Sequence, residues 1–130
     1  MFEDDWTRQT IASGFHNAFS LFAPGMSPGF SYAVYPNGQQ DGERAHIFVA
    51  GDGDHDAHAL YPTGDADKFE YENEVFMEGK GTIGCMVFSD YDNDSWTEVW
   101  VPNYDKGTID LFKLSAAEPA VEPTAEVFLQ

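Results

Sequence analysis

The residues of this chain best suited to chemistry are four acids in one short stretch, Asp90-Tyr91-Asp92-Asn93-Asp94-Ser95-Trp96-Thr97-Glu98. The acids stand at positions 1, 3, 5 and 9 of that stretch. Carboxylates on alternate residues of a tight loop converge on one point, and a hard cation such as Ca²⁺ takes six to eight oxygens. Without a cation, carboxylates held this close repel one another. The spacing predicts a Ca²⁺ site, and the alternative is a solvated acidic turn in a very acidic protein.

The segments around this stretch read as strands. Cys85–Phe88 before it and Val99–Val101 after it are short, apolar and rich in β-branched or aromatic residues. Asn103–Gly107 then predicts a hairpin turn, and Thr108–Leu114 alternates as another strand. The stretch opens as an EF-hand does, but its twelfth position is Val101, where an EF-hand has a glutamate. We therefore expect a unit of strand, acidic loop and strand.

Residues 90–105 resemble the FG-GAP repeat, also called the VCBS repeat, of β-propellers. This family includes the head of integrin α subunits, and its cation loop reads D-x-D-x-D-G-x-x-D/E between two inner strands of one blade. Ser95 stands here in place of the glycine. The resemblance implies a secreted, cell-surface or lumenal protein. It also implies that the ion is bound by the backbone carbonyl of Trp96 and by the side chains of Asp90, Asp92, Asp94 and Glu98.

A second group of acids and histidines lies at residues 51–58. It contains, in chain order, Asp52, Asp54, His55, Asp56 and His58. Carboxylates and imidazoles of this kind bind Zn²⁺, Mn²⁺ or a second Ca²⁺. Alternate residues of an extended chain share one face, so all five converge only if the chain turns. A ligand-binding or partner-binding rim and a plain acidic turn are the alternatives.

The chain also contains an internal repeat. Trp6–Gly14 aligns with Tyr71–Gly79, Pro28–Tyr35 with Gly81–Phe88, and Ile47–Val49 with Val99–Val101. A repeat period of about 50–60 residues is typical of propeller blades. We predict an all-β domain, residues 1–114, made of two four-stranded, propeller-blade-like antiparallel repeats (a partial β-propeller) at 5–62 and 68–114. An acidic linker at 65–67 joins them, and an extended tail rich in Ala, Glu and Pro occupies 115–130.

Composition limits the partners. The 130 residues suffice for one domain, and 42% hydrophobic with 15% aromatic residues indicate a globular fold. With 23 acidic against 6 basic residues the formal net charge is −17, which repels nucleic acid and anionic membranes. No apolar run reaches transmembrane length, so we expect no membrane insertion. The single cysteine, Cys85, excludes a disulfide within the chain.

Two blades alone leave sheet edges open, and propellers have four blades or more. Three arrangements would cover these edges. The chain could be the end of a longer propeller, it could complete a ring with other subunits or with copies of itself, or it could form a compact two-sheet domain. The function this predicts is a non-enzymatic, Ca²⁺-stabilised β-repeat module in protein–protein or protein–glycan association. One alternative is a structural subunit of a larger complex, held by its sheet edges and C-terminal tail. The other is an accessory or catalytic part of a polysaccharide-degrading enzyme that uses residues 52–58.

Overall fold

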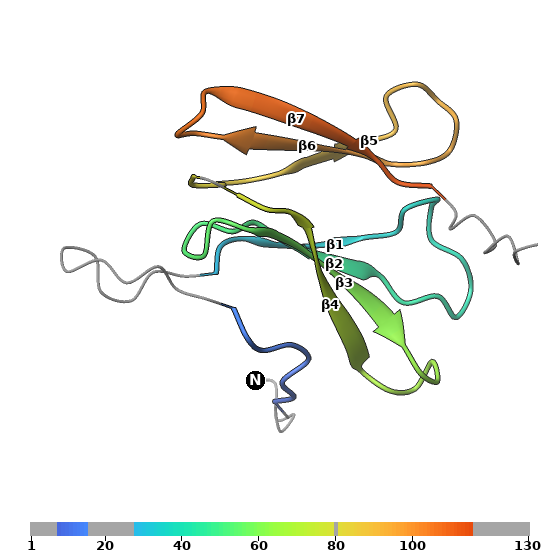
Figure 1. The fold of residues 1–130 in the computed structure, drawn as a ribbon. Coiled ribbons are helices and arrows are strands. Elements are labelled where there is room, and N and C mark those ends of the chain that lie inside the picture. Colours follow the sequence, from blue (N-terminus) through green and yellow to red (C-terminus); the bar gives the residue numbers. More distant parts are fainter. Residues whose placement is uncertain (1–7, 16–27, 80, 116–130) are drawn as a thin grey trace, which may run out of the picture.

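The computed structural model describes residues 8–15, 28–79 and 81–115. These parts of the chain contain no helix, and their seven strands form two antiparallel sheets that lie one over the other (Figure 1). The predicted all-β class is therefore confirmed. No described segment forms a helix with the length and apolar character needed to cross a bilayer.

The first sheet has four strands in sequence order, each antiparallel to its neighbour. They are β1 (Ser31–Val34), β2 (His46–Val49), β3 (Ala57–Thr63) and β4 (Glu70–Met77). β3 and β4 form the longest hairpin, with seven paired positions and an irregularity in register beside Ala57 and His58. Such a bulge lets consecutive residues of one strand, here Phe76 and Met77, both reach the core.

The second sheet has three strands, β5 (Val87–Ser89), β6 (Glu98–Asn103) and β7 (Thr108–Lys113). The acidic stretch connects β5 to β6, and a tight turn connects β6 to β7. In that turn the N–H of Gly107 donates to the carbonyl of Asn103 at 3.0 Å, and Gly107 has a φ of 64°, which favours glycine. The predicted order of strand, acidic loop, strand, turn and strand is confirmed.

Aromatic rings join the two sheets. The ring centroid of Phe48 on β2 lies 5.1 Å from that of Phe88 on β5, and Phe76 on β4 lies 5.2 Å from Phe112 on β7. Burial of such side chains is the main favourable term in folding. The core cluster consists of Phe48, Ala50, Ala57, Ala59, Met77, Ile83, Met86, Val99 and Val101.

The sheets differ from the expected two repeats in strand number. The second sheet has three strands, not four, because the strand expected to open the second repeat is β4 and pairs with β3. The strand expected within residues 6–14 is absent from the described part of that segment, residues 8–14. The tail lies outside the described residues beyond Ser115. The sheets are not closed into a ring.

The outer face of the second sheet is apolar. Val87, Trp100 and Leu111 are register partners across its three strands, and Ile109 lies two residues before Leu111. Neighbours of these residues along each strand point into the core, so this row points away from the first sheet. Val87, Leu111 and Ile109 are more than half exposed. We call Val87, Tyr91, Trp100, Ile109 and Leu111 the outer patch.

Candidate metal centre

The loop from Asp90 to Glu98 folds around its own carboxylates. The carboxylate of Asp90 accepts hydrogen bonds from the N–H groups of Asp94 at 3.1 Å and Ser95 at 3.0 Å. The carboxylate of Asp94 accepts one from the N–H of Trp96 at 2.9 Å. Short acidic side chains bond readily to backbone groups a few residues on, which is why they favour tight loops. Asp92 likewise accepts the N–H of Asp94 at 3.2 Å. The side chains of Asp90, Asp92 and Asp94 are therefore all bonded to the backbone of their own loop.

Three of the acids come together. Asp90, Asp92 and Glu98 each offer an oxygen, and these oxygens lie within 4.8 Å of one another. The first two residues are exposed, whereas Glu98 is only 3% exposed. One Glu98 oxygen, Oε2, accepts the N–H of Tyr91 at 2.6 Å, but the other, Oε1, is buried and has no hydrogen-bond partner. A buried carboxylate oxygen without a donor is unfavourable, so Oε1 lacks a partner in direct contact.

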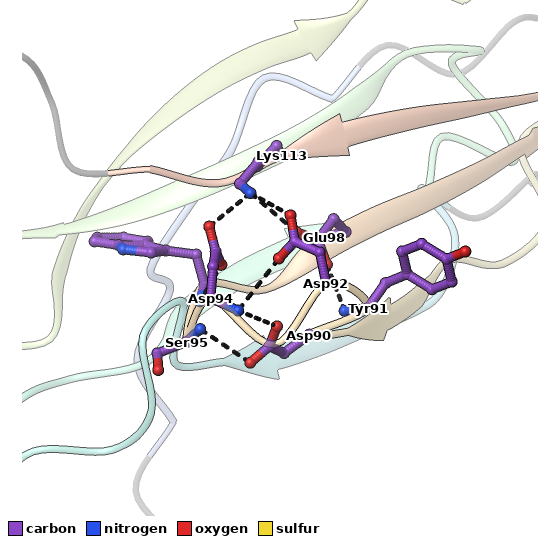
Figure 2. A network of polar contacts seen from close by, with 8 residues as sticks. Asp90, Tyr91, Asp92, Asp94, Ser95, Glu98 and Lys113 are labelled. Atoms are coloured by element: carbon purple, nitrogen blue, oxygen red, sulfur yellow. Dashed lines mark hydrogen bonds and ion pairs between the residues drawn. The ribbon is translucent and has the colours of Figure 1, made fainter.

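Asp94 and Lys113 form the other half of the site (Figure 2). The Lys113 ammonium lies 2.6 Å from Asp94 Oδ2, 2.7 Å from Asp92 Oδ2 and 3.8 Å from Glu98 Oε1. Its hydrogen bond to Asp94 holds the pKa of that carboxyl below its ordinary value. Hydrogen bonds to Asp92 and Asp94 raise the pKa of Lys113 in turn. Three of the four acids of the loop, Asp92, Asp94 and Glu98, therefore share one ammonium group.

Trp96 connects the loop to a pocket between the sheets. The N–H of the next residue, Thr97, donates to the carbonyl of Pro36 at 2.7 Å, which fixes the end of the loop against the β1–β2 connection. Burial lowers the pKa of His46 in this pocket, against the opposing effect of Glu43. The pocket has a volume of about 260 Å³ and is lined by Pro36, Asn37, Glu43, His46, Tyr61, Trp96, Leu114 and Ser115.

Ser95 adopts a backbone conformation that favours glycine. Its φ is 74°, in the left-handed region, where a residue with a Cβ is strained by about 1–2 kcal/mol. Replacing Ser95 with glycine removes this strain but gives the unfolded chain more freedom. We therefore expect Ser95→Gly to raise the free energy of unfolding by about 0.5–1 kcal/mol, measured by denaturant titration.

Ser89 provides the matched control for this prediction. It is an exposed serine in strand β5, where glycine is unfavourable. Ser89→Gly should lower the free energy of unfolding by about 0.5–1 kcal/mol, an effect of opposite sign. Equal destabilisation by both substitutions would contradict the left-handed conformation at Ser95.

The second group of predicted ligands, residues 52–58, forms a turn in which Asp54, Asp56 and His58 have hydrogen-bond partners within the protein, whereas the buried Nδ1 atom of His55 has none. Asp54 and His58 are buried side chains whose Oδ2 and Nε2 atoms lie 2.7 Å apart, and the other ring nitrogen of His58 lies 3.2 Å from Asn73 Oδ1. Asp56 accepts the N–H of Gly79 at 2.9 Å. Asp52 and His55 do not form a metal-ligand cluster with these residues. Within the described residues, the candidate cluster of metal ligands consists of Asp90, Asp92 and Glu98. The turn thus has a structural explanation.

Lys113 is the site residue that the sequence reasoning missed. A signal for it existed, because the predicted turn at Asn103–Gly107 sets the register that pairs Glu98 with Lys113. Comparisons of the chain with protein-family models, with curated proteins and with solved structures found no match.

Proposed function

We propose that the loop from Asp90 to Glu98 binds a Ca²⁺ ion, and that the domain is a non-enzymatic module that associates with a protein or a glycan. The observation that carries the ion-binding proposal is the buried Oε1 atom of Glu98, which lacks a hydrogen-bond donor beside two further carboxylates. The Lys113 ammonium lies 3.8 Å from this oxygen, whereas a bound divalent cation would contact it directly. The ion would hold the ends of β5 and β6 together.

The donor set favours a hard cation. All side-chain ligands of the cluster are carboxylate oxygens, whereas Zn²⁺ and Cu²⁺ favour sites with His or Cys. Oxygens bound to one Ca²⁺ lie at most about 5 Å apart, which is twice the metal–oxygen distance. The separation of the three ligand oxygens, within 4.8 Å, agrees with that limit. In the FG-GAP interpretation Asp94 and the carbonyl of Trp96 complete the set, and the sheets correspond to blades of a partial propeller.

The outer patch supports the association part of the proposal. Ile109 is 69% exposed, and Tyr91, 70% exposed, stands edge-on to Trp100 with ring centroids 5.8 Å apart. Apolar side chains gathered on one face of a sheet are typical of protein interaction sites, and exposed aromatic rings also bind glycans. Because β5 leads directly into the acidic loop, an ion in the loop would order the border of this face. A secreted, cell-surface or lumenal setting belongs to the same proposal, as does a role as a subunit of a larger complex.

Thermal unfolding with EDTA and with added Ca²⁺ tests the ion-binding proposal. At free Ca²⁺ 100 times the Kd, the ion should stabilise the wild-type protein by about 2.7 kcal/mol. Glu98→Gln should abolish this stabilisation, because it removes the buried charge while its amide oxygen still accepts the N–H of Tyr91.

The control substitution is Glu72→Gln, the same change at an exposed position of β4. This variant should respond to Ca²⁺ as the wild type does. If the wild-type protein unfolds at the same temperature in EDTA and in millimolar Ca²⁺, the loop is a charged turn and the proposal fails.

A further inference from the structure

The Lys113 ammonium lies beside the acidic loop and binds Asp92, one of the three candidate ligands of a cation. It lies 2.7 Å from Asp92 Oδ2 and 2.6 Å from Asp94 Oδ2, close to the 2.3–2.6 Å at which Ca²⁺ binds oxygen (Figure 2). We infer that Lys113 is a built-in counter-ion of the loop that Ca²⁺ must displace, so that this residue sets the affinity of the site. The inference rests on the proposed Ca²⁺ site and concerns its regulation.

The fold holds Lys113 at this position. It is the last residue of β7 and the register partner of Glu98 at the start of β6. Partners directly opposite one another on one face have their Cβ atoms about 5 Å apart, so a lysine there reaches over the loop that follows β5. The hairpin between β6 and β7 fixes this register through six paired positions. The pairing of β7 with β6 therefore places the Lys113 ammonium beside the carboxylates.

Almost every carboxylate oxygen of the loop already has a partner. Both oxygens of Asp90 accept backbone N–H groups, and so does Oδ1 of Asp92. In Asp94 the Oδ1 atom accepts the N–H of Trp96, and in Glu98 the Oε2 atom accepts that of Tyr91. The remaining oxygens are Glu98 Oε1, which has no donor, and the Oδ2 atoms of Asp92 and Asp94, which Lys113 holds.

A cation in this loop therefore competes with Lys113 for the same oxygens. Lys113 binds Asp92, which belongs to the group of three ligands whose oxygens lie close together, and also Asp94, which lies outside that group. Ca²⁺ carries two charges and takes six to eight oxygens, whereas the ammonium carries one charge and three donors. Two cations cannot share these oxygens at such distances without strong repulsion. The side chain of Lys113 is 45% exposed on a flexible stem, so it can leave into solvent when the ion enters.

Calorimetric titration with Ca²⁺ tests this role in Lys113→Met, which removes the ammonium and keeps an unbranched side chain. The variant should bind Ca²⁺ roughly tenfold or more tightly than the wild type. Lys113→Arg, which keeps a cation able to hold two carboxylates, should bind Ca²⁺ no more tightly than the wild type. Lys113→Gln provides a second neutral variant with hydrogen-bond donors and should behave as Lys113→Met does.

Lys68→Met is the matched control, because Lys68 forms an exposed ion pair with Asp65 at 3.4 Å outside the loop. It changes the net charge by the same amount and should leave the affinity within about twofold. If both neutral Lys113 variants bind Ca²⁺ with the wild-type affinity, Lys113 is no competitor and the inference is overturned, while the proposed Ca²⁺ site stands. If neither the wild type nor any Lys113 variant binds millimolar Ca²⁺, the proposed site itself is wrong.

Discussion

Replacing Phe48 with alanine is expected to lower the free energy of unfolding by about 3–5 kcal/mol. The Phe48 side chain is 1% exposed and touches both sheets: its ring centroid lies 5.7 Å from Phe76 on β4 and 5.1 Å from Phe88 on β5. Truncation therefore opens a cavity where the sheets meet and removes two aromatic contacts at once. Denaturant unfolding followed by circular dichroism measures this loss.

Phe69→Ala serves as the control for Phe48→Ala. Phe69 is 61% exposed and lies just before β4, so its truncation should change the free energy of unfolding by no more than about 0.5 kcal/mol. Similar losses from the two substitutions would mean that Phe48 does not join the sheets, and the face-to-face packing would have to be abandoned.

Gly79→Ala is expected to lower the free energy of unfolding by about 3 kcal/mol or more. Gly79 follows β4, and a methyl group on its Cα would overlap the backbone carbonyl of His55 in the turn between β2 and β3. That turn cannot easily retreat, because His55 has a φ of 69° and the neighbouring Asp56 accepts the N–H of Gly79 at 2.9 Å. The same denaturant titration measures the effect.

Gly38→Ala is the control for Gly79→Ala. It measures the loss of stability when a glycine is replaced at a position where the added methyl group meets no neighbouring atom. Gly38 has a φ of 81°, and an added Cβ would meet no atom within 4 Å. Alanine there should cost only about 1–2 kcal/mol, through backbone strain. If Gly79→Ala costs no more than Gly38→Ala, the turn at residues 52–58 is not held against β4. Its acids and histidines would then be free to rearrange around a metal.

The strands were largely predictable from the sequence, because alternation and β-branched or aromatic residues are local signals. Their grouping was not predictable from such signals. Residues 65–67 were expected as a linker between repeats, but they belong to the turn that joins β3 to β4. In this turn the N–H of Lys68 donates to the carbonyl of Asp65 at 3.0 Å, and Gly64 has a φ of 69°. A polar Gly-containing segment serves equally as linker or turn, and only the pairing of the flanking strands distinguishes the two.

The same limit applies to the site. The spacing of the acids brought Asp90, Asp92 and Glu98 together, because these residues belong to one loop and need no distant contact. Lys113 lies 21 residues from Asp92, and only the register between β6 and β7 places it there. Residues 52–58 show the opposite case. Their types fit a metal, but Asp54 and His58 pair with each other and Asp56 bonds to a backbone N–H that sequence spacing does not reveal.

The strand order also has a consequence for folding kinetics. Within the described residues each sheet pairs only strands that are neighbours in the sequence. Pairing neighbouring strands costs less chain entropy than pairing distant ones, and chains rich in local pairings fold faster. Each sheet can therefore form as a separate kinetic unit, with the long β3–β4 hairpin as the natural nucleus of the first. We therefore expect the aromatic contact between Phe48 and Phe88 to form after the hairpins, when the two sheets meet.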